Sequence, residues 1–405
     1  MPSPLARLAA AALIAAAPVA QAQSPDPADW SGVLEEARGQ TVFWHAWGGS
    51  PTVNDFIAWV GDEVQDRYGV TLEHVKLTDT GEAVSRVIAE HAAGQDTGGA
   101  VDLIWINGEN FAALQSRGLL QDPWVTELPN WRFIDPEANP ATVTDFTLPT
   151  NGQEAPWGLA QVVFPYDAAR VETPPRSMAA LLDWARANPG RFAFPQPPDF
   201  LGHTFLKQAL SELAADPAAL QDPVDDATYD AITSPLWDFM DALTPHLWRG
   251  GAAYPTSGPQ LFQLMADGEI DIAISFSPNE ASNLIANVTL QDSVRTFVME
   301  AGSLGNASFV AIPYNANAAA GAMVVADFLM SPEAQAEMAN PEVWGVGTVL
   351  AMDRLSAEDR ARFDDLPLGI ATLPAEALGA ILPEPHPSWV ERLEADWTAR
   401  YGTAQ

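Results

Sequence analysis

The sequence predicts an α/β fold with two lobes, and three observations support this prediction. From Thr41 to Arg117, strand and helix patterns alternate, which is typical of a doubly wound, mainly parallel sheet with helices on both faces. A strand pattern at Trp157–Tyr166 then leads into a second group of helices. A strand pattern at Ser308–Pro313 leads back to the first lobe.

The first unit contains three pairs of a strand followed by a helix. They are Thr41–Trp47 with Val53–Tyr68, Val70–Leu77 with Gly81–Ala93, and Val101–Ile106 with Phe111–Arg117. In the first helix Phe56, Val60 and Val64 share one face, and Gly69 fits a C-cap. The third strand, VDLIWI, is a continuous apolar run of the kind found in buried parallel strands.

The second half follows a long excursion. Residues Leu120–Pro156 are rich in proline and tryptophan and are expected to run over the surface. Helices are then predicted at Met178–Ala187, Phe205–Ala214, Ala231–Leu243 and Pro259–Asp267, with a buried strand at Gly268–Phe276. After the returning strand, a helix is expected at Ala318–Met330. Another starts at Ser331-Pro332-Glu333, Val343–Val349 forms a turn, and the last fifty residues are mainly helical.

The N-terminus has the pattern of a secretory signal. Arg7 provides the positive charge, Leu8–Ala17 the apolar region and Ala20–Ala22 an A-x-A cleavage site, so Met1–Ala22 is expected to be removed. The apolar run is shorter than the roughly 20 residues that span a bilayer. The chain has no cysteine, hence no lipid attachment site of that kind, and its stability must come from a packed core. These features predict a protein free in the periplasm.

The charge of the chain excludes some partners. Its formal net charge is −34, and it has only two lysines, Lys76 and Lys207. Nucleic acids and anionic membranes favour basic surfaces, so neither is expected as a partner. The acidity is interpreted mainly as a means of solubility, although its field would also attract cations to a cleft.

Two loops of the first unit are candidate ligand sites, because open α/β sheets hold ligands at the carboxyl ends of their strands. The first loop contains Trp47, Gly48, Gly49 and Ser50, where glycines allow close approach to backbone N–H groups and the next helix begins. An ordinary tight turn is the alternative interpretation.

The second loop contains Asn107, Glu109 and Asn110. The two asparagines can donate and accept hydrogen bonds, and Glu109 could meet a cationic group. Helix capping is the alternative for Asn107 and Glu109, since both positions favour a helix N-terminus without any ligand.

Further candidates lie on the predicted crossing strands and in the second lobe. They are Trp157, Gln161, Tyr254, Thr256, Ser257, Asn279, Asn306, Ser308 and Trp344. Aromatic rings near a carboxylate could bind an organic cation through cation–π attraction. For most tryptophans burial in the core is the alternative, and for Tyr254 a surface loop.

Enzymatic and metal chemistry find little support. The six histidines are scattered without metal-ligand spacing, and the chain has neither a nucleophile-elbow motif nor a P-loop. We expect no catalytic residue, no metal and no cofactor. A secreted carbohydrate-active enzyme is the rival class, and Asp102 with Glu109 would be a weak carboxylate pair for it.

Several segments together resemble the type II periplasmic solute-binding proteins of ABC importers. They are FWHAWGG (Phe43–Gly49), DLIWINGENF (Asp102–Phe111), WGLAQVVFPYD (Trp157–Asp167), FQLMADGEIDIAISFSPNE (Phe262–Glu280), LGNASFVAIPYNA (Leu304–Ala316) and ADFLMSPEAQ (Ala326–Gln335). The chain looks most like the YnjB-type branch, related to thiamine, polyamine and ferric-ion binders. Iron binders of this group use neighbouring tyrosines, and no two tyrosines are adjacent here.

The resemblance implies two α/β lobes joined by two crossing strands, with a ligand held in the cleft and no catalysis. It implies a first lobe of residues 23–156 and 308–405 and a second lobe of residues 157–307. It also implies a monomer that delivers a small solute to a membrane permease. An organic cation or amine is the favoured ligand, from the acidic field, the tryptophans and Glu109. An oxyanion held by Gly49, Ser50, Thr256, Ser257 and Ser308, or a sugar, remains the alternative.

Overall fold

A computed structural model describes residues 25–374 and 377–402, so the predicted signal Met1–Ala22 lies outside the described residues. The largest sheet follows the order β10-β9-β3-β1-β2, and β6 pairs with β9 as well. Its strands are β1 (Thr41–Trp47), β2 (Thr71–Leu77), β3 (Leu103–Ile106), β6 (Glu154–Gln161), β9 (Ser303–Ala311) and β10 (Ile381–Leu382). Strand β1 pairs in parallel with β2 and β3, as the alternating pattern predicts.

Helix α2 (Pro51–Tyr68) illustrates how the sequence sets an element. Pro51 stands at its start, where the missing N–H costs nothing. The helix ends at Gly69, which has a φ of 71° and donates its N–H back to the last turn, as the C-cap prediction requires. Its buried face contains Phe56, Val60 and Val64, so the predicted amphipathic stripe is confirmed.

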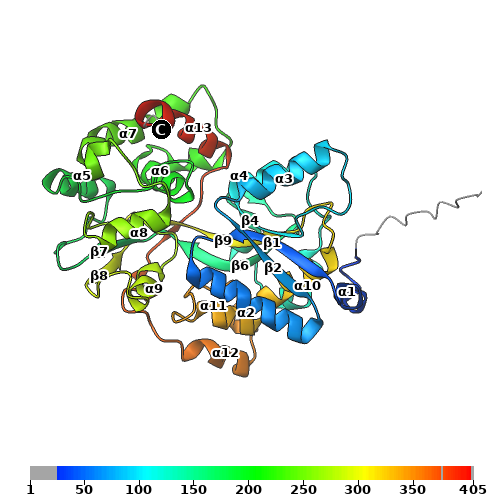
Figure 1. The fold of residues 1–405 in the computed structure, drawn as a ribbon. Helices are drawn as coiled ribbons and strands as arrows, with labels where there is room; N and C mark the ends of the chain where they lie inside the picture. Colours follow the sequence, from blue (N-terminus) through cyan, green and yellow to red (C-terminus); the bar gives the residue numbers. More distant parts are fainter. Residues whose placement is uncertain (1–24, 375–376, 403–405) are drawn as a thin grey trace, which may run out of the picture.

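Helices cover both faces of this sheet (Figure 1). On one face α2 and α10 (Ala319–Leu329) pack with Val42, Trp44 and Leu103, and on the other α3 (Gly81–Ala92) and α4 (Gly108–Gln115) pack with Ile104 and Ile106. The first half also contains α1 (Trp30–Ala37), α11 (Pro332–Ala339) and α12 (Ala357–Asp364). Helix α10 is buried along its whole length and contacts both α1 and α2. The C-terminal part of the chain therefore completes the core of the first half.

Two long strands connect the halves. Strands β6 and β9 run antiparallel from Glu154 opposite Ala311 to Gln161 opposite Gly305, with an irregularity between Pro156 and Gly158. They lie at the centre of the molecule (Figure 1). The predicted strand Trp157–Tyr166 is divided between β6 and β7 (Phe164–Asp167), and the returning strand begins at Ser303, five residues before its predicted start.

The second half is mainly helical around its own core. Its helices are α5 (Met178–Ala187), α6 (Phe200–Leu213), α7 (Tyr229–Leu243), α8 (Gly258–Ala266), α9 (Glu280–Ala286) and α13 (Ser388–Tyr401). Strand β7 pairs antiparallel with β8 (Val294–Phe297). Within the expected strand Gly268–Phe276, residues Ile270–Phe276 are buried, but the segment forms only isolated bridges at Ile272 and Ser275 and no extended ladder.

The C-terminal helix packs with the second half. Trp389, Leu393 and Trp397 of α13 belong to the second core, and α13 contacts α6. Helix α13 lies within residues 308–405, which the sequence predicts to belong to the first lobe. Its core contacts, however, are with α6 and the neighbours of α6 in the second half. The excursion before β6 contains three short 3-10 helices, at Val125–Glu127, Pro129–Phe133 and Pro140–Thr142, and a hairpin of β4 (Thr144–Asp145) and β5 (Leu148–Pro149).

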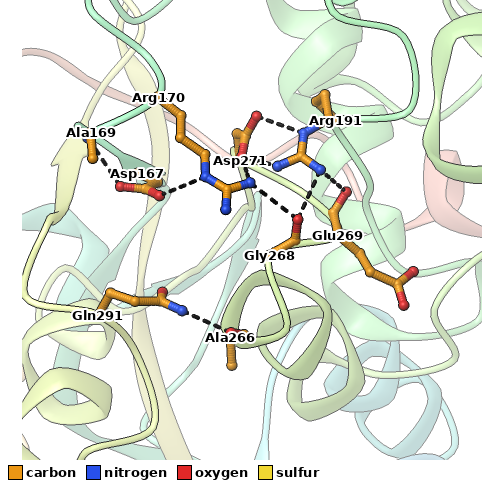
Figure 2. A network of polar contacts seen from close by, with 9 residues as sticks. All are labelled: Asp167, Ala169, Arg170, Arg191, Ala266, Gly268, Glu269, Asp271 and Gln291. Atoms are coloured by element: carbon orange, nitrogen blue, oxygen red, sulfur yellow. Dashed lines mark hydrogen bonds and ion pairs between the residues drawn. The ribbon is translucent and has the colours of Figure 1, made fainter.

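A polar network fixes the end of α8 to β7 (Figure 2). Arg191 donates to the carboxylate of Asp271, with 2.7 Å from Nε to Oδ2, and to the carbonyl oxygens of Gly268 and Glu269 at 2.8 and 2.9 Å. Arg170 donates to the Gly268 carbonyl at 3.2 Å and to Asp271 at 3.4 Å. Two guanidinium groups thus bind the backbone carbonyls of the turn that follows α8.

We expect Asp271→Asn to lower the free energy of unfolding by about 1–2 kcal/mol, because it weakens hydrogen bonds between charged groups. The carboxylate is nearly buried, but both guanidinium groups are partly exposed, which limits the loss through screening. Urea denaturation measures the effect. The control is Asp183→Asn, which removes an exposed ion pair with Arg186 and is expected to change stability by less than about 0.5 kcal/mol. Equal losses in the two variants would contradict the prediction.

Candidate functional site

The loops that follow β1, β2 and β3 lie side by side, because these strands are parallel neighbours. The Gly48 N–H donates to the Leu77 carbonyl at 3.0 Å, and the Thr80 hydroxyl donates to the Trp105 carbonyl at 3.2 Å. Strand β1 runs from α1 toward the region between the two halves (Figure 1). The carboxyl ends of the three strands therefore form one edge of the first half.

The turn after β1 is tightly packed. A Cβ atom on Gly48 would lie 2.6 Å from the Lys76 Cβ, and one on Gly49 would lie 2.3 Å from the Trp47 ring, so both positions require glycine unless these side chains move. Ser50 stands at the N-cap of α2, but its side chain makes no capping bond within the described part of the chain. Its half-buried hydroxyl is therefore not used by the helix.

The loop after β3 differs from simple helix capping. Asn107 occupies the N-cap position of α4, yet its Nδ2 donates to the Ala307 carbonyl at 2.7 Å and to Asp145 Oδ1 at 3.2 Å. The other oxygen of Asp145 accepts from the Gly108 N–H at 2.6 Å. Asp145, on the hairpin of the excursion, thus caps α4 in place of Asn107. Glu109 lies half-buried in the first turn of this helix.

Two carboxyl groups are buried beside this loop. Burial raises the pKa of Asp145 to about 8, against the hydrogen bonds from Asn107 and Gly108, and the nearby Glu109 and Glu384 raise it further. Burial also raises the pKa of Glu154 well above its ordinary value, with a contribution from Asp145. Neither oxygen of Glu154 has a hydrogen-bond partner among the described residues. This edge of the first half therefore holds more carboxyl groups than its hydrogen bonds satisfy.

The second half presents an ion pair to the same place. Lys207 of α6 and Glu384 are both buried, and Nζ lies 2.7 Å from Oε2. The Lys207 Nζ also lies 4.3 Å from the ring centroid of Phe146, which follows Asp145 in the first half. The carboxylates of Glu109 and Asp145 thus approach the Lys207–Glu384 pair from the other half.

Asp199 of the second half and Asp79 of the first half form another pair of acidic residues that lie near each other. Asp199 caps α6, accepting from the Leu201 N–H at 2.9 Å, and Asp79 accepts from the Gly81 N–H at 2.7 Å after β2. Burial raises the pKa of Asp199 to about 6, and Asp79 adds to this shift. The predicted Asn110 lies half-buried next to the Asp79 turn, since its Oδ1 would be 3.8 Å from a Cβ at Gly81.

The predicted turn 254–258 adjoins the start of α6. The Gln196 N–H donates to the Pro255 carbonyl at 2.9 Å. Tyr254 is buried, and its ring packs on Trp397 with centroids 5.0 Å apart. Ser257 caps α8 by accepting from the Gln260 N–H at 3.4 Å, and the exposed Thr256 bonds to the side chain of Gln260. These contacts favour structural roles for Tyr254 and Ser257 over the predicted ligand contact.

Trp157 and Trp344 lie in an aromatic cluster of the first half. The ring of Trp157 is fully buried, with centroids 4.9 Å from Trp105, 5.3 Å from Trp44 and 5.4 Å from Trp344. Trp344 also packs on Phe56 at 5.8 Å. For both predicted residues the surroundings favour core packing, the alternative given in the sequence analysis.

Asn279 connects the halves rather than lining an open surface. It is fully buried, and its Nδ2 donates to the carbonyl of Trp344 at 3.1 Å and to Asn283 Oδ1 at 2.8 Å. Asn283 donates to the same Trp344 carbonyl at 2.8 Å. The start of α9 is thus bonded to the Trp344 turn of the first half.

The remaining candidates lie on the crossing strands. Asn306 of β9 is opposite Ala160, and Ser308 is opposite Gly158. Gln161 donates from Nε2 to the Leu378 carbonyl at 2.8 Å. These strand positions lie next to Ala307, whose carbonyl accepts from Asn107.

The structure thus brings Asn107 and Glu109 together with residues that were not predicted as site residues, namely Asp145, Phe146, Glu154, Lys207 and Glu384. Among these five residues, only Lys207 stands out in the sequence, because it is one of two lysines and lies within an apolar helix segment. Among residues 25–374 and 377–402, no three His, Asp or Glu side chains are arranged to hold a metal ion. In the same residues no helix combines the length and apolarity needed to cross a membrane.

Comparison with known proteins gives consistent matches. Residues 58–358 match the family of bacterial extracellular solute-binding proteins. Protein YnjB of Escherichia coli strain K12 is 43% identical over 375 residues, which cover 93% of this chain and 94% of that protein.

Solved structures match over nearly the whole length. The periplasmic binding protein AfuA from Actinobacillus pleuropneumoniae, with fructose-6-phosphate bound, has a TM-score of 0.63 at 14% identity, covering 90% of this chain and 99% of AfuA. The spermidine/putrescine substrate-binding protein PotD from Streptococcus pneumoniae has a TM-score of 0.59 at 15% identity, covering 89% and 98%. At these identities the likeness concerns the fold alone.

Proposed function

Since the chain belongs to the bacterial extracellular solute-binding proteins and is a periplasmic solute-binding component of an ABC transporter, we propose that it binds a small organic cation between its two halves. The family assignment confirms the resemblance inferred from the sequence, with its type II periplasmic-binding fold. Proteins of this family deliver small solutes to ABC permeases and are not enzymes. The ligand class, the use of the inter-lobe site and action as a monomer are our proposal.

One observation supports the proposal that the ligand is a cation. Glu109 and Asp145 of the first half meet Glu384 beside the second half, where the Lys207 ammonium acts against the effect of burial on the pKa of Glu384. A cation in such a site favours ionisation of carboxyl groups that burial otherwise keeps protonated, so the site favours a positive solute. The acidic chain, at a net charge of −34, supports the same sign.

The proteins of similar fold bind different solutes. PotD is a spermidine/putrescine binding protein, whose solutes are amines, whereas AfuA holds a sugar phosphate. A sugar phosphate would place negative charge beside Glu109, Asp145 and Glu384 and oppose their ionisation, whereas an amine would favour it. The carboxylates therefore favour the amine over an oxyanion.

We expect the melting temperature of the wild type to rise by a few degrees with an amine-bearing cation such as putrescine, thiamine or choline, because ligand bound only to the folded state stabilises it. Sulfate, phosphate and glucose should have no such effect. Glu109→Gln should reduce the shift and weaken binding, since it removes a charge near the ligand. Differential scanning fluorimetry over the panel makes this measurement.

Glu73→Gln is the matched control, since Glu73 is exposed on β2 in the same half, and it should retain the full shift. A response to sulfate or phosphate alone, unchanged in Glu109→Gln, would reject the cationic ligand. An effect of equal size in both variants would show that Glu109 acts only through the overall charge.

A further inference from the structure

Lys207 is a charged side chain in an unusual place. It is 1% exposed, on α6, where the second half meets the first. Lysine is rarely buried unless its ammonium is paired, because removal from water is costly. The other lysine of the chain, Lys76, is exposed at the end of β2. The surroundings of the Lys207 ammonium therefore need to compensate its charge.

The ammonium lies in a box of one carboxylate and two aromatic rings. Glu384 Oε2 is 2.7 Å from Nζ, and the ring centroids of Phe146 and Phe200 are 4.3 and 5.7 Å away. A cation within about 6 Å of an aromatic ring centroid is attracted by the ring. Carboxylate and aromatic groups around one nitrogen are the chemistry that recognises alkylammonium groups in general.

The first half contributes Phe146 through an unusual backbone. Phe146 has a φ of 53°, a left-handed conformation that is rare for an aromatic residue. Its ring packs against Gly108, where a Cβ would lie 2.6 Å from the ring, and Gly108 itself has a φ of 58°. The left-handed backbone of Phe146 and the lack of a side chain at Gly108 thus let the ring lie over the ammonium. Backbone strain of this kind is often kept where a ligand is held.

More carboxyl groups than positive groups surround the box. Asp145 precedes Phe146, and both Asp145 and Glu109 lie close enough to Glu384 to affect the ionisation of the cluster. Glu154, 1% exposed and without a hydrogen-bond partner in the described chain, lies next to Asp145. A cation beside these groups favours their ionised form over the protonated form that burial imposes, so the position favours a cation whichever molecule supplies it.

We infer that the box formed by Phe146, Phe200 and Glu384 is the subsite for the cationic nitrogen of the solute, and that the Lys207 ammonium occupies it when no solute is bound. This inference rests on the proposed function. The flexible four-carbon stem of lysine lets its ammonium leave while α6 stays in place. Lys207 then acts as a tethered competitor, and it sets specificity because only a cation that binds the box better than a primary ammonium displaces it.

The test compares choline binding by the wild type and Lys207→Met with isothermal titration calorimetry. Methionine keeps an unbranched stem and removes the charge, so we expect at least tenfold tighter choline binding. Lys76→Met, which removes the other lysine, should bind choline like the wild type. Adding Phe146→Ala to Lys207→Met should abolish the gain, because the ring that faces the cation is lost.

Weaker, equal or absent choline binding by folded Lys207→Met would overturn the inference. Weaker binding would indicate that Lys207 holds a negative group of the solute. If Lys207→Met does not fold because Glu384 is left unpaired, Lys207→Met/Glu384→Gln removes that charge, and it too should bind choline more tightly than the wild type. The amine panel with Glu109→Gln tests the proposed function separately, since that function stands if amines bind and Lys207→Met shows no gain.

Discussion

Replacing Trp157 by alanine is expected to lower the free energy of unfolding by about 3–5 kcal/mol. The side chain is fully buried where β6 leaves the first half, and it contacts the rings of Trp44, Trp105 and Trp344. These rings are held by the sheet and by the Trp344 turn, so they cannot close the cavity. Urea denaturation monitored by circular dichroism measures the loss.

Two variants separate cavity formation from other effects. Trp157→Phe keeps most of the ring volume, and it should cost less than half as much. Trp184→Ala removes a half-buried ring on α5, where part of the surface is already in water, so its cost should also be smaller. A loss below about 1 kcal/mol in Trp157→Ala, with weakened solute binding, would instead support the ligand contact predicted from the sequence.

Stability is expected to fall as the pH rises from about 4 to 8, because several buried carboxyl groups keep their protons in the folded state. Burial raises the pKa of Asp145 to about 8 and that of Asp327 to about 6, and it raises that of Glu154 well above its ordinary value. In the unfolded chain these groups release their protons near pH 4. Their contribution is therefore complete below pH 4 and is lost as the pH rises through each folded-state pKa.

The expected size of the effect is up to about 1.4 kcal/mol per pH unit for each such group within its window. Carboxylates with lowered pKa, such as Glu90 and Glu333, act in the opposite direction but gain their contribution mostly below pH 5. Thermal denaturation across pH 5–8 tests the trend. Glu154→Gln cannot ionise, so it should flatten the dependence and be more stable than the wild type at pH 8.

Glu35→Gln is a suitable control, because Glu35 is exposed on α1, and it should leave the pH dependence unchanged. A stability that increases between pH 5 and 8, or a Glu154→Gln variant with the slope of the wild type, would contradict the prediction. Either result would mean that the Asp145–Glu154 region admits water.

The sequence predicts several single elements well, because their signals are local. The bounds of β1 and α5 agree with Thr41–Trp47 and Met178–Ala187, and α2 begins only two residues before its predicted start. Periodicity, the proline at the start of α2 and Gly69 at its end act within one element. The strand expected at Gly268–Phe276 depends on partners elsewhere in the chain, and it forms single bridges only.

The candidate site is predicted only in part, because it also depends on contacts between distant segments of the chain. Asn107 and Glu109 follow a strand end, which the sequence reveals. Asp145 reaches them from a hairpin in the excursion, and Glu384 comes from the distant segment between β10 and α13. No periodic pattern marks such residues, because their role arises from contact between distant segments. Most predicted tryptophans turned out to pack with one another, since an isolated sequence does not distinguish a core ring from a ligand platform.

The position of strand β9 determines when the polypeptide can complete its folding. It lies between β3 and β6 and bonds to both, while α10 just after it fills the space between α1 and α2. A chain that ends before Ser303 would leave both neighbouring strands with open edges and the first core without its central helix. Neither half can therefore finish folding during synthesis or export until most of the polypeptide has emerged. Such late, long-range closure slows folding.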